Sequence, residues 1–176
     1  MMRGCHTKRG LLSILSSVYD PLGFVSPFVL RGKIMFQNEC RIVGKGWDEP
    51  LETSTQKQWT EWLDDLPKLD QFAVDRCLVP DDFGNVRECR LHHFSDASQD
   101  AYGSVSYVRL VNAEGDVHCS FLMGKSRLAP LKTMTIPRLE LSAAVMAVQM
   151  DQMLRRELRT DVHGSTFWTD SMLVLQ

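Results

Sequence analysis

Hydrophobic residues in the first seventy positions recur every three or four residues. This spacing predicts an amphipathic helix from Lys8 to Tyr19, which Asp20-Pro21-Leu22-Gly23 ends because proline and glycine favour turns. A second helix is expected from Pro27 to about Val43, and a third from Thr53 or Ser54 to Pro67. We therefore expect residues 1–70 to be helical. The apolar positions that define these helices are Leu11, Leu15, Val18, Val29, Ile34, Trp59 and Trp62.

After about Gln71 the pattern changes to the β-branched and aromatic composition of strands. Pro137 then opens a long helix to about Leu158, and another helix is expected to begin at Ser171. The core side of the long helix is formed by Leu139, Ala143, Met146, Ala147, Met150, Met153 and Leu154. Strands are predicted at Phe72–Val79, Val86–Phe94, Tyr102–Val111, Val117–Gly124 and Gly164–Thr169. The fold class is thus α/β: a helical segment over 1–70, then a mixed sheet with a long packed helix over 71–176.

Composition narrows the function classes without selecting one. The formal net charge of −2 argues against a strongly basic nucleic-acid binder. Residues 91–176, however, hold eight Lys or Arg against nine Asp or Glu, so neutralising three of those acids leaves a mildly basic surface. The five cysteines form no C-x-x-C motif and are typical of free thiols in a reducing compartment. With no secretion signal and no apolar run of about 20 residues, the expected location is intracellular, cytoplasmic or nuclear, away from membranes.

Three acidic residues stand where strands and the long helix would bring them together. Asp96 closes the strand that contains Phe94, and Asp170 follows the strand that ends in Trp168-Thr169. Glu140 lies one turn into the intervening helix, between two leucines. Carboxylates that converge repel one another unless they are protonated or bound to cations, and hard oxygen ligands suit Mg²⁺ or Mn²⁺. The pattern favours a two-ion site for phosphodiester hydrolysis.

A basic run without acids precedes the long helix. Its members are Lys125, Arg127, Lys132 and Arg138. We interpret them either as phosphate contacts to a nucleic-acid substrate or as a solvated loop. His92 and His93 alternate across a strand, so at most one faces the acids, and both are interpreted as structural.

Several motifs, taken in order, resemble a known family of retroelements. Retroelement ribonuclease H domains have Asp, Glu and Asp motifs similar to Phe94-Ser95-Asp96-Ala97-Ser98, Pro137-Arg138-Leu139-Glu140-Leu141 and Trp168-Thr169-Asp170-Ser171. The region after the reverse-transcriptase palm in BEL/Pao-type retrotransposon polyproteins resembles Tyr19-Asp20-Pro21-Leu22-Gly23-Phe24 and Gly46-Trp47-Asp48-Glu49-Pro50-Leu51. The resemblance runs from about Arg9 to the end of the chain.

This resemblance implies a ribonuclease H-like domain over 71–176 and a thumb- or connection-like role for 1–70. It implies that Asp96, Glu140 and Asp170 are the catalytic metal ligands, with an RNA–DNA hybrid as substrate and the rest of the polyprotein as partner. The palm aspartates have no counterpart in this sequence, and a fourth acidic ligand is expected beyond Gln176. The sequence is therefore interpreted as a fragment that is truncated at its C-terminus.

Three alternatives remain beside this interpretation. An integrase or transposase core places two aspartates before its glutamate, whereas the order here is Asp96, Glu140, Asp170. A Pao-type aspartic peptidase would need Asp-Thr-Gly or Asp-Ser-Gly turns, and neither aspartate is followed by that glycine. The third alternative is an inactive retroelement remnant that binds nucleic acid or nothing.

Overall fold

The computed structural model describes residues 6–75, 77–172 and 174, and the chain divides into two compact units, Met1–Val74 and Asp75–Gln176. Each unit has its own hydrophobic core. Within the described residues, no helix is long and apolar enough to cross a membrane. Four of the cysteines, Cys40, Cys77, Cys89 and Cys119, are free thiols.

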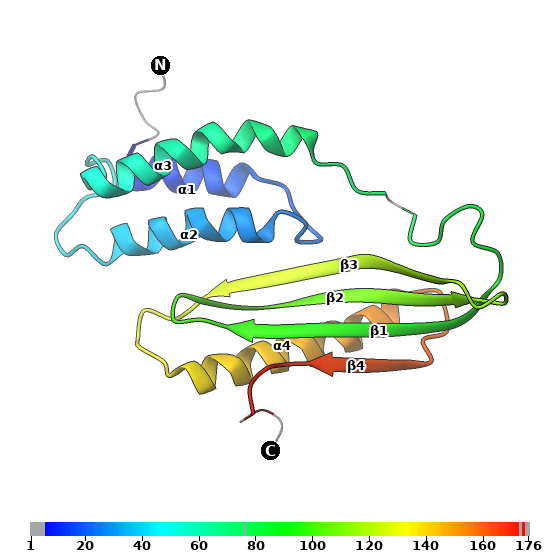
Figure 1. The fold of residues 1–176 in the computed structure, drawn as a ribbon. Coiled ribbons are helices and arrows are strands. Elements are labelled where there is room, and N and C mark those ends of the chain that lie inside the picture. Colours follow the sequence, from blue (N-terminus) through cyan, green and yellow to red (C-terminus); the bar gives the residue numbers. More distant parts are fainter. Residues whose placement is uncertain (1–5, 76, 173, 175–176) are drawn as a thin grey trace. The chain divides into compact units, whose positions relative to one another are not determined.

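The first unit contains the three expected helices (Figure 1). These are α1 (Lys8–Ser17), α2 (Ser26–Cys40) and α3 (Thr53–Asp65), and the 3₁₀ helix η1 (Leu66–Gln71) continues from α3. The Thr7 hydroxyl caps α1 by accepting a hydrogen bond from the Gly10 backbone N–H at 3.1 Å. Asp20 closes the turn after α1, since its carboxylate accepts from the backbone N–H groups of Phe24 and Val25.

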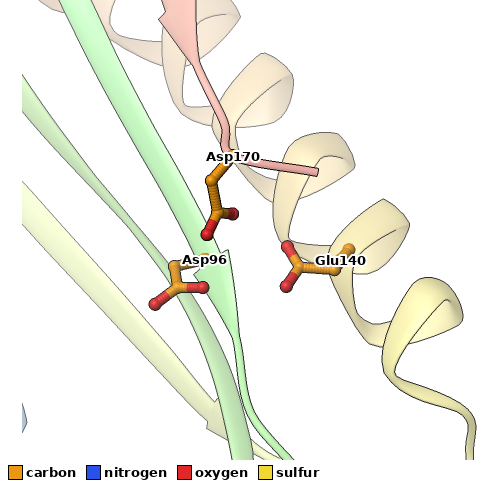
Figure 2. A group of neighbouring side chains, drawn as sticks. All are labelled: Asp96, Glu140 and Asp170. Carbon is orange, nitrogen blue, oxygen red and sulfur yellow. The ribbon is translucent and has the colours of Figure 1, made fainter. Parts of the chain in front are cut away.

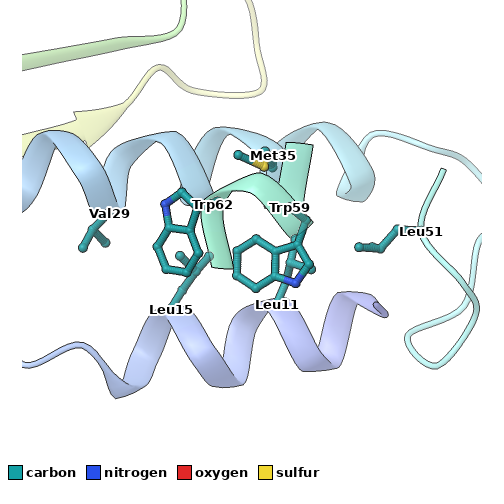
Figure 3. Packing of buried hydrophobic residues seen from close by; sticks show 7 residues of the cluster. All are labelled: Leu11, Leu15, Val29, Met35, Leu51, Trp59 and Trp62. Atoms are coloured by element: carbon teal, nitrogen blue, oxygen red, sulfur yellow. The ribbon is translucent and has the colours of Figure 1, made fainter. Parts of the chain in front are cut away.

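Two stacked tryptophans form the centre of this unit. Trp59 and Trp62 are fully buried, with ring centroids 4.7 Å apart and planes 9° from parallel. They lie between α1 and α2 (Figure 3), where Leu11 and Leu15 contribute the facing side chains. The Trp62 indole N–H donates to the Phe28 carbonyl at 2.9 Å, so its buried polar atom is satisfied. Both tryptophans, which are among the apolar positions of the predicted helices, thus pack in the core of this unit.

The second unit is a mixed sheet with one long helix on one face (Figure 1). The strands are β1 (Val86–Ala97), β2 (Ala101–Asn112), β3 (Val117–Leu128) and β4 (Gly164–Trp168), in the order β3-β2-β1-β4. β2 pairs antiparallel with both β1 and β3, and β4 pairs parallel with β1. The helix α4 (Ile136–Glu157) packs over β1 and β2. The expected α/β class with a long packed helix is confirmed.

Alternation along the strands separates the two faces of this sheet. In β1, Cys89, Leu91 and His93 are buried beneath α4, whose own buried side includes Met146 and Met150.

Near the end of β1, Asp96 pairs with Gly103 of β2. A Cβ at Gly103 would lie 2.9 Å from the Lys125 carbonyl oxygen, so the backbones approach as closely as they do because this residue is glycine.

Two of the predicted elements differ in the structure. The strand expected over 72–79 is absent from its described residues, 72–75 and 77–79, and Phe72 and Val74 are about half exposed. β-Branched composition does not form a strand by itself, because a strand needs a neighbour whose backbone groups are free to pair. The helix expected from Ser171 is also not seen in the described residues 171, 172 and 174. The Val174 backbone N–H donates to the Ser171 carbonyl in a turn, and the rest of the predicted helix lies outside the described residues.

Replacing Trp62 with alanine should strongly destabilise the helical unit. The change removes a fully buried ring, its stacking contact with Trp59 and its hydrogen bond to Phe28, so the free energy of unfolding should fall by about 3–5 kcal/mol. Urea unfolding followed by far-UV circular dichroism measures this loss. Trp47→Ala is the matched control, because that indole is 49% exposed and should cost far less. Equal losses for the two variants would contradict the central role of the Trp59–Trp62 stack.

Candidate metal centre

Three separate elements each deliver one carboxylate to the same edge of the sheet. Asp96 is the last residue but one of β1, and Asp170 follows the end of β4 by two positions. Because β1 and β4 run parallel, their carboxyl ends lie side by side. The connection to β4 passes through α4, and its N-terminal turns, which carry Glu140, lie at this same edge (Figure 2).

The three side chains point toward a common centre. One carboxylate oxygen from each of Asp96, Glu140 and Asp170 lies within 4.8 Å of the other two. Asp96 and Asp170 are exposed, whereas Glu140 is only 8% exposed. The Asp96 carboxylate accepts a hydrogen bond from the Ala97 backbone N–H at 2.7 Å. The Glu140 Oε2 atom is buried and has no hydrogen-bond partner among the described residues.

The surroundings of Glu140 oppose its ionisation. Burial is the main cause that raises the pKa of this carboxyl, and the nearby carboxylates of Asp96 and Asp170 raise it further. The backbone N–H of Ala97 lowers the pKa of Glu140 without cancelling these effects. A buried carboxylate beside two other carboxylates, with no cationic side chain bonded to it among the described residues, has its charge poorly compensated by the protein.

A divalent cation fits this arrangement of ligands. The donors are three carboxylates, which are the hard oxygen ligands that Mg²⁺ and Mn²⁺ prefer, and Glu140 Oε2 is unpartnered and buried. No histidine or cysteine belongs to the group, so its chemistry does not favour a softer metal.

The four basic residues singled out from the sequence are all exposed, but they lie on different elements. Lys125 and Arg127 are on β3, paired with Ser104 and Tyr102 of β2. Arg127 and Tyr102 line a cavity together with Leu141 and Ser142, the two residues directly after Glu140. Lys132 lies in the loop before α4, and Arg138 lies in the first turn of that helix. Within the described part of the chain, none of the four forms an ion pair.

Sequence reasoning missed a buried polar network on the same elements as the three acids. His93 was correctly interpreted as structural, and it is fully buried, but its partners Ser106 and Asp151 were not anticipated. One signal was available: Asp151 interrupts the core side of α4, directly after Met150 and eleven positions beyond Glu140.

Glu140→Gln should stabilise the metal-free protein at neutral pH. A carboxyl whose folded pKa is raised contributes stability below its unfolded value near 4.5, and that contribution is lost as the pH rises through the folded pKa. The amide carries no charge, so the variant should melt a few degrees above the parent at pH 7 in EDTA, and the difference should vanish below pH 4.5. Calorimetry at both pH values measures it, with the exposed hairpin residue Glu114→Gln as control. A lower melting temperature for Glu140→Gln at pH 7 would contradict the account of its charge.

Comparison with known proteins identifies one family for this chain. A family model described as "Pao retrotransposon-like RNaseH-like domain" matches residues 7–171, which include most of the helical unit and all three acids of the centre. Among curated proteins, no match is found. Since the family model spans nearly the whole chain, the protein belongs to the Pao retrotransposon-like RNase H-like domain family.

Proposed function

We propose that the chain is a metal-dependent endoribonuclease of ribonuclease H type, which cleaves the RNA strand of an RNA–DNA hybrid within a Pao-type retrotransposon polyprotein. The observation that carries this proposal is the cluster of Asp96, Glu140 and Asp170, with its buried and unpartnered Glu140 oxygen. The family supports a nuclease-like domain with a nucleic-acid substrate.

The three carboxylates would hold Mg²⁺ or Mn²⁺ at the edge where β1 and β4 end. Such ions would supply the chemistry of phosphodiester hydrolysis, namely activation of a water and stabilisation of the leaving oxygen. Asp96 and Asp170 are exposed, so their oxygens face the side from which a polynucleotide can approach. Glu140 contributes a charge that the fold leaves uncompensated, and a cation would relieve that cost.

The basic residues along β3 and the start of α4 would contact the phosphates of the hybrid. Arg127 supports this assignment best, because it borders a cavity formed with the residues next to Glu140. Contacts to phosphate position a nucleic acid without reading its sequence, as an enzyme acting on many hybrid sequences requires. Lys125 shares the face of β3 that carries Arg127, whereas Lys132 and Arg138 would reach the backbone nearer the helix.

The helical unit is assigned a thumb- or connection-like role in the same proposal. It forms a core of its own, and the family match extends across it from residue 7. In this role it would link the sheet unit to a polymerase region elsewhere in the polyprotein.

Cleavage of a labelled RNA–DNA hybrid should require Mg²⁺ or Mn²⁺ and should be lost in Asp96→Asn. Loss of one ligand removes several kcal/mol of charge stabilisation, so the rate should fall roughly 10²–10⁴-fold. Asp161→Asn, an exposed aspartate in the loop before β4, is the matched control and should keep the parent rate.

The alternatives give different results in the same assay. A folded chain that binds the hybrid without cleaving it would identify an inactive remnant. Cleavage in EDTA, or cleavage that survives in Asp96→Asn, would reject the three-carboxylate centre. Hydrolysis of a peptide substrate that Asp96→Asn abolishes would instead support the peptidase alternative.

Arg127→Gln should weaken binding of the hybrid more than it slows cleavage. Removing one phosphate contact should raise KM with little change in kcat, and it should lower the slope of log Kd against log salt by about 1. Steady-state kinetics and binding at 50–200 mM salt measure both quantities. Arg156→Gln, an exposed arginine at the other end of α4, is the control. An unchanged KM and salt slope for Arg127→Gln would remove this residue from the substrate surface.

A further inference from the structure

A polar network crosses the core of the sheet unit. The fully buried His93 ring has its Nδ1 atom 2.7 Å from the Ser106 hydroxyl and its Nε2 atom 3.1 Å from a carboxylate oxygen of Asp151. That carboxylate also accepts from the Ser165 hydroxyl and from the Arg155 guanidinium, whose Nε lies 3.0 Å from Oδ2. Arg155 in turn donates to Ser165 at 2.7 Å.

The donors and acceptors in this network can be assigned. Burial is the main cause that lowers the pKa of His93, so the ring is neutral and carries one N–H. Burial opposes ionisation of Asp151, but the Ser165 hydrogen bond, Arg155 and His93 outweigh it and lower its pKa, so this side chain is a carboxylate that only accepts. The His93 proton therefore sits on Nε2 and is donated to Asp151, and the Ser106 hydroxyl donates to Nδ1. In each of these hydrogen bonds, one side chain is therefore the defined donor and the other is the defined acceptor.

The network joins the same three elements that carry the acids of the metal centre. His93 lies on β1 three residues before Asp96, and Ser165 lies on β4 five residues before Asp170. Asp151 lies on α4 eleven residues after Glu140, which is three helical turns plus about 20°, so both face the sheet. From these spacings, the network lies about 10–17 Å along each element from its acid.

Directional side-chain bonds matter for β4 because it is a short strand at the edge of the described sheet. The Trp168 indole N–H also donates to His92 Nδ1 at 3.2 Å, and the rings of Phe167 and Trp168 stack on His93 and Phe94. β4 pairs with β1 over five residues, from Arg90↔Gly164 to Phe94↔Trp168, and among the described residues it has no second neighbouring strand. Apolar packing is non-directional and tolerates sliding, whereas hydrogen bonds between defined partners hold one register. Arg155 adds a bond to the Val162 carbonyl just before β4, at 3.4 Å.

We propose that the His93–Asp151–Ser165 network positions the metal centre. It fixes the position of α4 and β4 along the direction of β1, and so it keeps the three carboxylates close together. Its members are positioning residues and touch neither metal nor substrate. The inference rests on the proposed function, because the expected consequence of moving the carboxylates apart is weaker binding of a cation.

Ser165→Ala tests the device with little risk to folding, because this side chain is only partly buried and the change removes a single hydroxyl. In the metal-free chain, the carboxyl ¹³C shifts of Asp96, Glu140 and Asp170 should move. The Mn²⁺ dissociation constant, measured by electron paramagnetic resonance of free Mn²⁺, should rise up to about tenfold. Ser165→Thr keeps a hydroxyl and should restore both readings.

Two further variants separate positioning from general destabilisation. His93→Phe keeps a ring but removes both hydrogen bonds, and it should shift the same three carboxyl signals. Leu122→Ala opens a cavity in the same core on β3, a strand that carries none of the acids, and it should leave both readings at parent values.

Unchanged carboxyl shifts in Ser165→Ala and His93→Phe would overturn the inference, as would a Leu122→Ala variant that moves both readings equally. Absence of Mn²⁺ binding by the folded parent chain would instead refute the proposed function. The two failures are distinguishable because the carboxyl shifts are recorded without metal.

Discussion

The parallel pairing of β1 with β4 is the constraint on which the candidate centre depends. Two antiparallel strands place their carboxyl ends at opposite edges of a sheet, whereas two parallel strands place them at the same edge. Asp96 and Asp170, far apart in sequence, become neighbours only because Arg90–Phe94 and Gly164–Trp168 run in the same direction. A parallel pair also needs a crossover connection, and here that connection contains α4 with Glu140. The parallel pairing of β1 and β4, with its crossover through α4, thus explains why all three acids lie at the same edge of the sheet.

Two buried glutamates in this chain show how a structural carboxylate differs from a candidate functional one. Glu39, 1% exposed, has Lys45 Nζ at 2.8 Å and accepts from the Glu52 backbone N–H. Burial opposes its ionisation, but Lys45, Thr55 and the Glu52 backbone outweigh burial, and the pKa of Glu39 is lowered. Glu140 is buried among carboxylates, and its pKa is raised. Only the second site carries an uncompensated charge, and such sites are where function is concentrated.

Each of the two units is stabilised by a different kind of core. The helical unit depends on stacked rings, which contribute large buried areas without specifying a register. The sheet unit combines apolar packing with the His93–Asp151–Ser165 network, whose bonds each need one partner in one place. A buried network of this kind is costly unless fully satisfied, and it makes one arrangement of α4 and β4 much more favourable than its neighbours. Such precision matters most in the unit that brings like charges together.

Most of the helices and strands, and the identity of the candidate acids, could be predicted from the sequence alone. Helical spacing around Leu11, Trp59 and Met146 was sufficient because amphipathic helices form from contacts between near neighbours in sequence. The order of Asp96, Glu140 and Asp170 at the ends of strands and on a helix also predicted a candidate site, helped by the family resemblance. The tertiary structure decided whether those acids meet, and whether Phe72–Val79 pairs. The meeting of the acids and the pairing of a strand both depend on which distant segment of the chain lies beside them. A local sequence pattern does not encode that information. The same holds for Asp151, which meets His93 across 58 positions of the chain: a polar residue on the core side of a helix is explained only when the fold supplies its partner.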